Sequence, residues 1–121
     1  MSRLHHVALG AIDVERVASF YRDVLDLPET ARHEDARGLR SVWLSLGPSV
    51  LMIERTDEPL RRVQGVGAGP FLLALTAPSG AEAALLRLGV VIESRSEYTL
   101  YFRDPEGNRV ALSRYPLPAG A

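Results

Sequence analysis

The stretch LHHVALGAIDVERVASFYRDVLDL, residues 4–27, reads as a strand followed directly by a helix. Apolar side chains alternate along its first eight residues, which is typical of a strand with one buried face. Asp13 then stands where a helix N-cap is expected, because a short acceptor side chain can bind the free N–H groups of the first turn. Helical spacing follows at Val14, Val17, Phe20, Tyr21, Val24 and Leu25.

Two more strands are predicted in the first half of the chain, at RSVWLSL (40–46) and SVLMIER (49–55). Gly47 and Pro48 separate them and indicate a tight turn. The stretch ARHEDA (31–36) before them fits either a short strand or a loop.

The second half repeats this order. FLLALTA (71–77) predicts a strand, and PSGAEAALLRLG (78–89) predicts a short helix, with Ser79 as its cap and Gly89 as its end. VVIES (90–94) predicts another strand. EYTLYFR (97–103) and NRVALSRY (108–115) form a hairpin around DPEG (104–107), where Pro105 presets φ and Gly107 tolerates positive φ.

Each half therefore reads βαβββ, and an internal repeat of this kind is a fold-level signal. We predict module one at about residues 3–56 and module two at about 70–115. The linker between them, at about 57–69, is rich in Gly and Pro.

The strand and helix of residues 4–27, together with YFRDPEGNRVAL (101–112), resemble the vicinal oxygen chelate superfamily. That group includes glyoxalase I, extradiol dioxygenases, and bleomycin and fosfomycin resistance proteins. The resemblance implies an α+β fold of two tandem βαβββ modules, in which a cupped mixed sheet holds a ligand and the helices lie on the outer face. It also implies a single domain over residues 1–121 and a homodimer.

The resemblance further implies a divalent metal held by the first and last strands of each module. The matching positions are His6, Met52, Leu72 and Ala111, the last standing where the family pattern G-N-x-I-E has its glutamate. Only His6 keeps a donor suited to such a metal, since a thioether prefers soft Cu(I) and three protein ligands are the usual catalytic minimum. We therefore expect no cofactor, with a divalent metal as the alternative.

Strand alternation predicts which side chains face the cup. These are His6, Trp43, Met52, Glu54, Leu72, Thr99, Tyr101, Arg109 and Ala111. Their neighbours are predicted to face the core: Val42, Leu44, Leu51, Ile53, Phe71, Leu73, Leu75, Phe102, Val110 and Leu112. His6 is the candidate catalytic residue. We expect His5 on the opposite face, and His33 and Arg109 in solvent.

The mostly apolar lining favours a small apolar or aromatic organic ligand. The leading hypothesis is a metal-independent binding protein that sequesters or senses such a molecule. One alternative is an enzyme, either a metal-dependent lyase, isomerase or dioxygenase or a metal-free catalyst using His6 and Tyr101. A second alternative is a non-catalytic dimeric subunit with a filled cup.

Composition limits the remaining classes of function. The 121 residues carry a formal net charge of −1 with interspersed signs, which gives no basis for binding nucleic acid or an anionic membrane. There is no cysteine, so disulfides and thiolate sites are excluded. With no signal-peptide pattern and no apolar run long enough to cross a bilayer, we expect a cytoplasmic protein.

Overall fold

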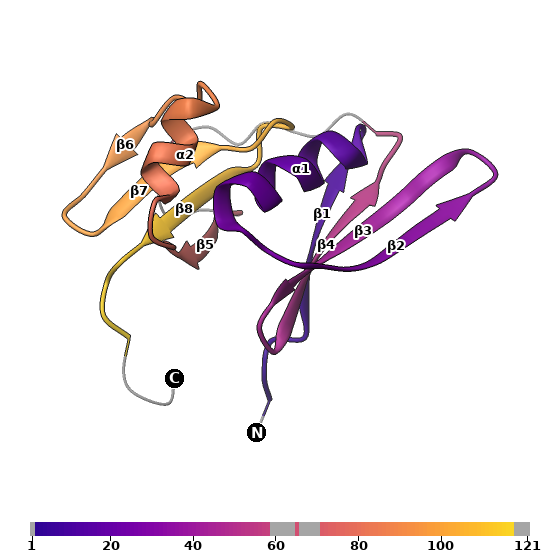
Figure 1. Ribbon diagram of the computed structural model, residues 1–121, viewed down its shortest axis with the longest axis horizontal. Helices are drawn as coiled ribbons and strands as arrows, with labels where there is room; N and C mark the ends of the chain where they lie inside the picture. The colour runs from indigo at the N-terminus through magenta and orange to yellow at the C-terminus, as the bar shows by residue number, and fades with distance from the viewer. Residues whose placement is uncertain (1, 59–64, 66–70, 118–121) are drawn as a thin grey trace. The chain divides into compact units, whose positions relative to one another are not determined.

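The computed structural model describes residues 2–58, 65 and 71–117, and it has the expected α+β architecture (Figure 1). The contacts divide the chain into two compact units, Met1–Arg61 and Arg62–Ala121, with one four-stranded mixed sheet in each. Each unit has the order βαβββ. The elements are β1 (His6–Ala11), α1 (Val14–Leu25), β2 (Glu29–Asp35), β3 (Gly38–Leu46), β4 (Ser49–Arg55), β5 (Leu73–Thr76), α2 (Ala81–Arg87), β6 (Ser94–Arg95), β7 (Thr99–Arg103) and β8 (Arg109–Ser113).

The first sheet has the strand order β1-β4-β3-β2. β1 pairs with β4 in parallel, and the other neighbours are antiparallel. Of the two possibilities for residues 31–36, the strand is correct up to Asp35, because β2 pairs with β3 with two register shifts, and Ala36 lies in the turn that follows. α1 packs against β1, β3 and β4. The predicted core side chains of this sheet are all fully buried: Val42, Leu44, Leu51 and Ile53.

α1 begins and ends with the capping interactions that its sequence favours. The Arg16 N–H donates to Asp13 Oδ1 at 3.1 Å, which confirms Asp13 as the N-cap. At the other end Asp26 adopts φ 54°, and its N–H donates to the Arg22 carbonyl at 2.8 Å. The predicted apolar stripe, from Val14 to Leu25, is buried.

The second sheet has the order β5-β8-β7-β6, with β5 parallel to β8. Ala74 pairs with Ala111 there, just as Ala8 pairs with Met52 in the first sheet, so the repeat extends to the register of the ladders. Phe102, Val110 and Leu112 are buried as predicted. In the described part of the chain, neither helix has the length and apolarity needed to span a bilayer.

Three local predictions for the second unit are wrong. Ser79 does not cap α2, since Gly80 occupies the N-cap with φ 82° and no side chain caps the helix. The strand predicted at 90–94 is reduced to β6, which starts only at Ser94. Phe71 is 75% exposed instead of buried, because β5 begins at Leu73 and the alternation does not reach back to it.

The DPEG turn between β7 and β8 depends on Asp104 as well as on its Pro and Gly. The Asp104 carboxylate accepts the backbone N–H groups of Glu106 and Asn108 and the Asn108 side-chain amide, each at 2.9 Å. Gly107 adopts φ 87°, as the turn requires. The contribution of Asp104 went unpredicted, although an aspartate two residues before a turn N–H is a known Asx-turn signal.

Of the predicted linker at 57–69, only Asp57, Glu58 and Gly65 lie within the described residues.

Candidate functional site

The face of the first sheet opposite α1, here called the first open face, carries four of the predicted site residues. Trp43 pairs with Met52, so their side chains share one row across the strands. Glu54 lies in the next row on β4, and His6 begins β1 on the same side. The backbone thus brings His6, Trp43, Met52 and Glu54 onto one surface.

His33 joins this surface, although the sequence suggested a solvated side chain. Its ring lies 4.8 Å from the Trp43 ring, centroid to centroid, and its Nδ1 is 3.0 Å from Ser41 Oγ. The cause is that residues 31–35 belong to β2, which holds His33 next to β3. Trp43 Nε1 is buried and has no hydrogen-bond partner in the described structure. Because protein atoms cover that N–H, an acceptor reaches it only when the neighbouring side chains move.

His5 and His6 contact each other instead of lying on opposite faces. Their Nδ1 atoms are 2.8 Å apart and both side chains are exposed. The alternation fails here because β1 begins at His6, so His5 is not a strand residue. At this distance one ring nitrogen must donate and the other must accept, so the contact requires at least one neutral imidazole. A catalytic role for His6 stays a prediction.

The corresponding face of the second sheet, the second open face, carries the other predicted residues. Tyr101 pairs with Ala111, and Arg103 pairs with Arg109. Leu72, Tyr101 and Arg109 line a shallow hollow together with the buried Phe102 and Val110, and in this structure it has no space for a water-sized molecule. Thr99 lies at the far end of β7, where its hydroxyl donates to Ser113 Oγ at 2.9 Å.

Arg109 is not the solvated arginine that the sequence suggested, since it is only 6% exposed. Its Nε donates to the Phe71 carbonyl at 2.8 Å, and its Nη1 lies 3.5 Å from the Gly65 carbonyl. These acceptors are far from Arg109 in the sequence, so a local reading of the turn could not reveal them.

The residues at the four family metal positions do not fit a hard divalent ion. They supply one imidazole, one thioether and two hydrocarbon side chains, and Ala111 is only 1% exposed. Among the described residues, no three His, Cys, Asp or Glu side chains are grouped closely enough to hold a metal.

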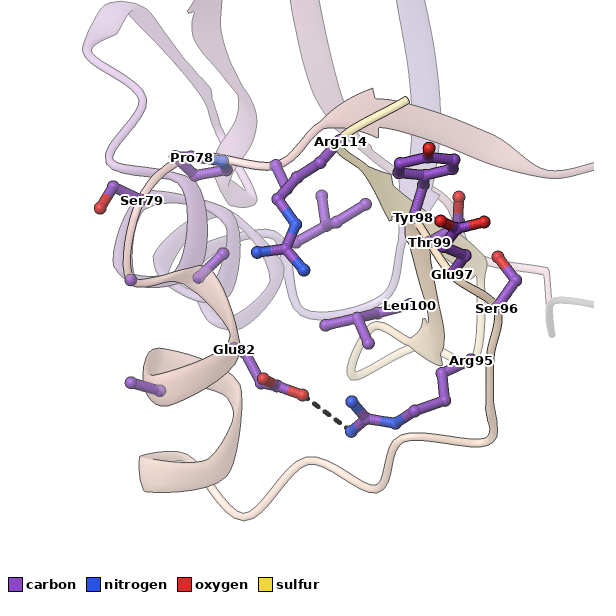
Figure 2. Close-up of a pocket in the computed structure, with 15 residues that line it drawn as sticks. Pro78, Ser79, Glu82, Arg95, Ser96, Glu97, Tyr98, Thr99, Leu100 and Arg114 are labelled. Carbon is purple, nitrogen blue, oxygen red and sulfur yellow. Dashed lines mark ion pairs between the residues drawn. The ribbon is translucent and has the colours of Figure 1, made fainter. Parts of the chain in front are cut away.

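A second cavity, of about 630 Å³, lies on the helix side of the second sheet (Figure 2). The start of α2, the β6–β7 segment and the end of β8 surround it, and Leu100 and Leu112 supply apolar wall. Glu82 and Arg95 form an ion pair across its rim at 2.7 Å. Thr99 also borders this cavity, opposite to the predicted cup. No pattern in the sequence predicted this cavity, although a seven-residue helix can cover only part of a sheet.

Two ion pairs fix the far end of the first sheet. Arg55 on β4 hydrogen-bonds the carboxylate of Asp35 and holds the pKa of that group below its ordinary value. Arg37 in the β2–β3 turn binds Asp57 through two bonds of 2.6 and 3.1 Å, which likewise lowers the pKa of Asp57. Both pairs join the β2–β3 turn to the end of β4.

A family model described as the Glyoxalase/Bleomycin resistance protein/Dioxygenase superfamily matches residues 3–112. No curated protein matches the chain. Among solved structures, a variant of the fosfomycin resistance protein FosX from Listeria monocytogenes, in complex with Mn(II) and a dihydroxypropylphosphonic acid, is similar at 18% identity. The match covers 97% of this chain and 95% of that one, with a TM-score of 0.78.

Lactoylglutathione lyase from Agrobacterium tumefaciens is 23% identical, with 93% of each chain covered and a TM-score of 0.65. An integron cassette protein from V. cholerae is also 23% identical, covering 96% of this chain and 97% of that one with a TM-score of 0.69. At these identities the structural matches establish the fold and not the chemistry.

Proposed function

We propose that the chain, which belongs to the Glyoxalase/Bleomycin resistance protein/Dioxygenase superfamily, binds a small organic molecule. We further propose that it does so without using a divalent metal. The observation that carries this proposal is the set of side chains at the four family metal positions. His6, Met52, Leu72 and Ala111 offer one nitrogen ligand in total, which is too few for a catalytic site.

The side chains around these positions support an apolar or aromatic ligand. On the first open face, Trp43 and Met52 lie side by side in one row. On the second, Leu72 and Tyr101 line the same hollow. Aromatic and thioether groups offer large, adaptable contact areas, and the Trp43 N–H and the Tyr101 hydroxyl can fix the orientation of a ligand. Sequestering or sensing such a molecule requires only this binding.

The test is a thermal-shift screen of small aromatic compounds, run on untagged protein in excess chelator. A ligand that binds only the native state raises Tm by mass action, so hits should survive the chelator. Hits are then measured by calorimetry with Tyr101→Ala, which we expect to weaken binding about tenfold because it removes an aromatic contact. Tyr115→Ala, at an exposed tyrosine beyond β8, is the matched control and should bind like the parent protein.

Metal analysis by plasma mass spectrometry separates this proposal from the enzyme alternative. We expect substoichiometric metal that added ions do not restore. Stoichiometric metal, or ligand binding that the chelator abolishes, would reject metal independence and favour a lyase or dioxygenase resembling glyoxalase I.

We also propose a homodimer. Large apolar side chains are exposed on the second unit, including Phe71 at 75% and Val91 at 74%, and association would remove such groups from water. Sedimentation velocity over a range of concentrations should show a species of twice the chain mass. A monomer at every concentration would contradict this proposal.

A further inference from the structure

The cavity on the helix side of the second sheet has the size of a small-molecule site (Figure 2). Its volume is about 630 Å³, within the range typical of ligand pockets. Leu100 and Leu112 pair in register on β7 and β8 and form its apolar floor. α2 borders the cavity with Ala81, Glu82 and Ala83, and the two methyl side chains fill little of it, so Leu100 stays half-buried.

Four charged side chains surround this floor, and two of them satisfy each other. Glu82 and Arg95 form an ion pair at 2.7 Å across the rim. In the described part of the chain, the guanidinium of Arg114 and the carboxylate of Glu97 form no hydrogen bond or ion pair. Both side chains are exposed, so a ligand can reach them. The cavity therefore offers one unpaired positive group and one unpaired negative group.

The two unpaired groups come from different walls of the cavity (Figure 2). Arg114 follows β8, and its side chain reaches into the cavity. Glu97 belongs to the segment between β6 and β7 and lies beside Tyr98. No ion pair joins Arg114 to Glu97, so each can meet an opposite charge that a ligand brings. The lining is thus neutral in sum, with its two unpaired charges set apart around an apolar floor.

We propose that this cavity binds a zwitterionic α-amino acid with an apolar side chain. Its carboxylate accepts from the Arg114 guanidinium, and its ammonium group donates to the Glu97 carboxylate. Both contacts are charge-assisted hydrogen bonds, and the guanidinium fork matches a carboxylate in shape. The apolar side chain lies on Leu100 and Leu112, which removes hydrocarbon surface from water. The cavity lies on the opposite side of the sheet from the second open face, so this site goes beyond the function proposed above.

The probe is L-phenylalanine, compared with phenylpropionate, which lacks the ammonium group, and phenethylamine, which lacks the carboxylate. Each is titrated into ¹⁵N-labelled protein at constant ionic strength near neutral pH. We expect phenylalanine to shift the backbone amide resonances of Ser96, Leu100 and Leu112 saturably and to leave those of β2 unmoved. Each analogue should bind about tenfold more weakly, because one charge-assisted bond is lost.

Two substitutions identify which group meets which charge. Arg114→Gln should weaken phenylalanine binding about tenfold and make phenylalanine and phenethylamine bind alike. Glu97→Gln should weaken it by a similar factor and make phenylalanine and phenylpropionate bind alike. Arg87→Gln, at an exposed arginine on α2, and Glu34→Gln, at an exposed glutamate on β2, are the matched controls and should bind like the parent protein.

A titration without saturable shifts at the lining residues overturns the inference, and so does an analogue that binds as tightly as phenylalanine. This failure differs from a failure of the proposed function. Hits from the chelator screen that depend on Tyr101 keep that function even when phenylalanine leaves the cavity unmoved. Saturable phenylalanine binding that Arg114→Gln weakens keeps this site even when no hit of the screen depends on Tyr101.

Discussion

Asp104 organises the β7–β8 turn through one carboxylate that accepts three hydrogen bonds. The group is only 4% exposed, so water cannot replace those bonds if the side chain is lost. The N–H groups of Glu106 and Asn108 would then be left without their partner. Leaving a buried donor unsatisfied costs more than the hydrogen bond itself contributes.

Asp104→Ala should therefore lower the free energy of unfolding by about 1–3 kcal/mol, the range for unsatisfied buried polar groups. Urea denaturation followed by circular dichroism measures this change. Asp104→Asn is the control and should lose less, because its amide oxygen can still accept from the backbone. Equal losses in the two variants would contradict this account of the turn.

Asp35 is the residue through which stability should depend on pH. The hydrogen bond from Arg55 lowers its folded-state pKa below the ordinary value of 3.8. A lowered pKa means that the carboxylate stabilises the fold above the ordinary value, and that this contribution is lost as the pH falls through the folded pKa. Because the group is exposed, the effect should be small.

The prediction is that Asp35→Asn flattens the loss of stability as the pH falls from mildly acidic values to below the ordinary value of 3.8. The measurement is the urea midpoint as a function of pH. Asp23→Asn, at an exposed carboxylate on α1, controls for the removal of one negative charge. If Asp23→Asn flattens the curve as much as Asp35→Asn, the Arg55 pair is not responsible.

At the scale of elements, α1 was predictable and α2 was only partly so. For α1 the Asp13 cap, the apolar stripe and the length all predict the same helix, so the local signals are sufficient. For α2 the sequence predicts Ser79 as the cap, with Gly80 as the next residue. The structure uses Gly80 in a left-handed conformation, which depends on how the chain leaves β5 and not on the capping preference of serine.

This difference yields a matched pair of substitutions. Gly80→Ala should cost about 1 kcal/mol, because an alanine at φ 82° is strained even though no atom lies within 4 Å of the added Cβ. Ser79→Ala should leave the urea midpoint unchanged, since no side chain caps α2. A larger loss of stability for Ser79→Ala than for Gly80→Ala would instead indicate that Ser79 caps α2.

The candidate site, too, was predictable only where the signal in the sequence is local. Alternation within strands correctly placed Trp43, Met52 and Tyr101 on shared faces with their register partners, because that rule is local. The separate prediction of solvated side chains was wrong for His33 and Arg109, whose surroundings come from other parts of the chain. The binding roles of all these residues stay predictions that the experiments above address.

At the scale of the whole molecule, the two units repeat one topology on cores of different size. In the first unit, a 12-residue helix covers strands whose core side chains are fully buried. In the second, α2 has seven residues and β6 has two. Local stability follows buried apolar area and protected hydrogen bonds, so the units should differ in how readily they open.

Hydrogen exchange measured by mass spectrometry should therefore show slower exchange in β3 and β4 than in β5 and β6. β3 lies between two strands of its sheet, whereas β6 pairs only with β7. Uniform protection across both units would show that the molecule opens as one cooperative body. In that case the smaller core of the second unit would not limit its stability.

Trp43 is the single tryptophan of the chain, and it stands on the first open face. With excitation at the red edge of the absorption band, where the four tyrosines contribute little, the emission comes from Trp43 and reports on the first unit. Because the indole lies against His33, a ligand that disturbs this ring contact should shift the wavelength of the emission. Events in the second unit do not alter Trp43 emission unless they reach the first unit, so a change in that emission when a ligand binds the second unit would be a label-free measure of communication between the repeats.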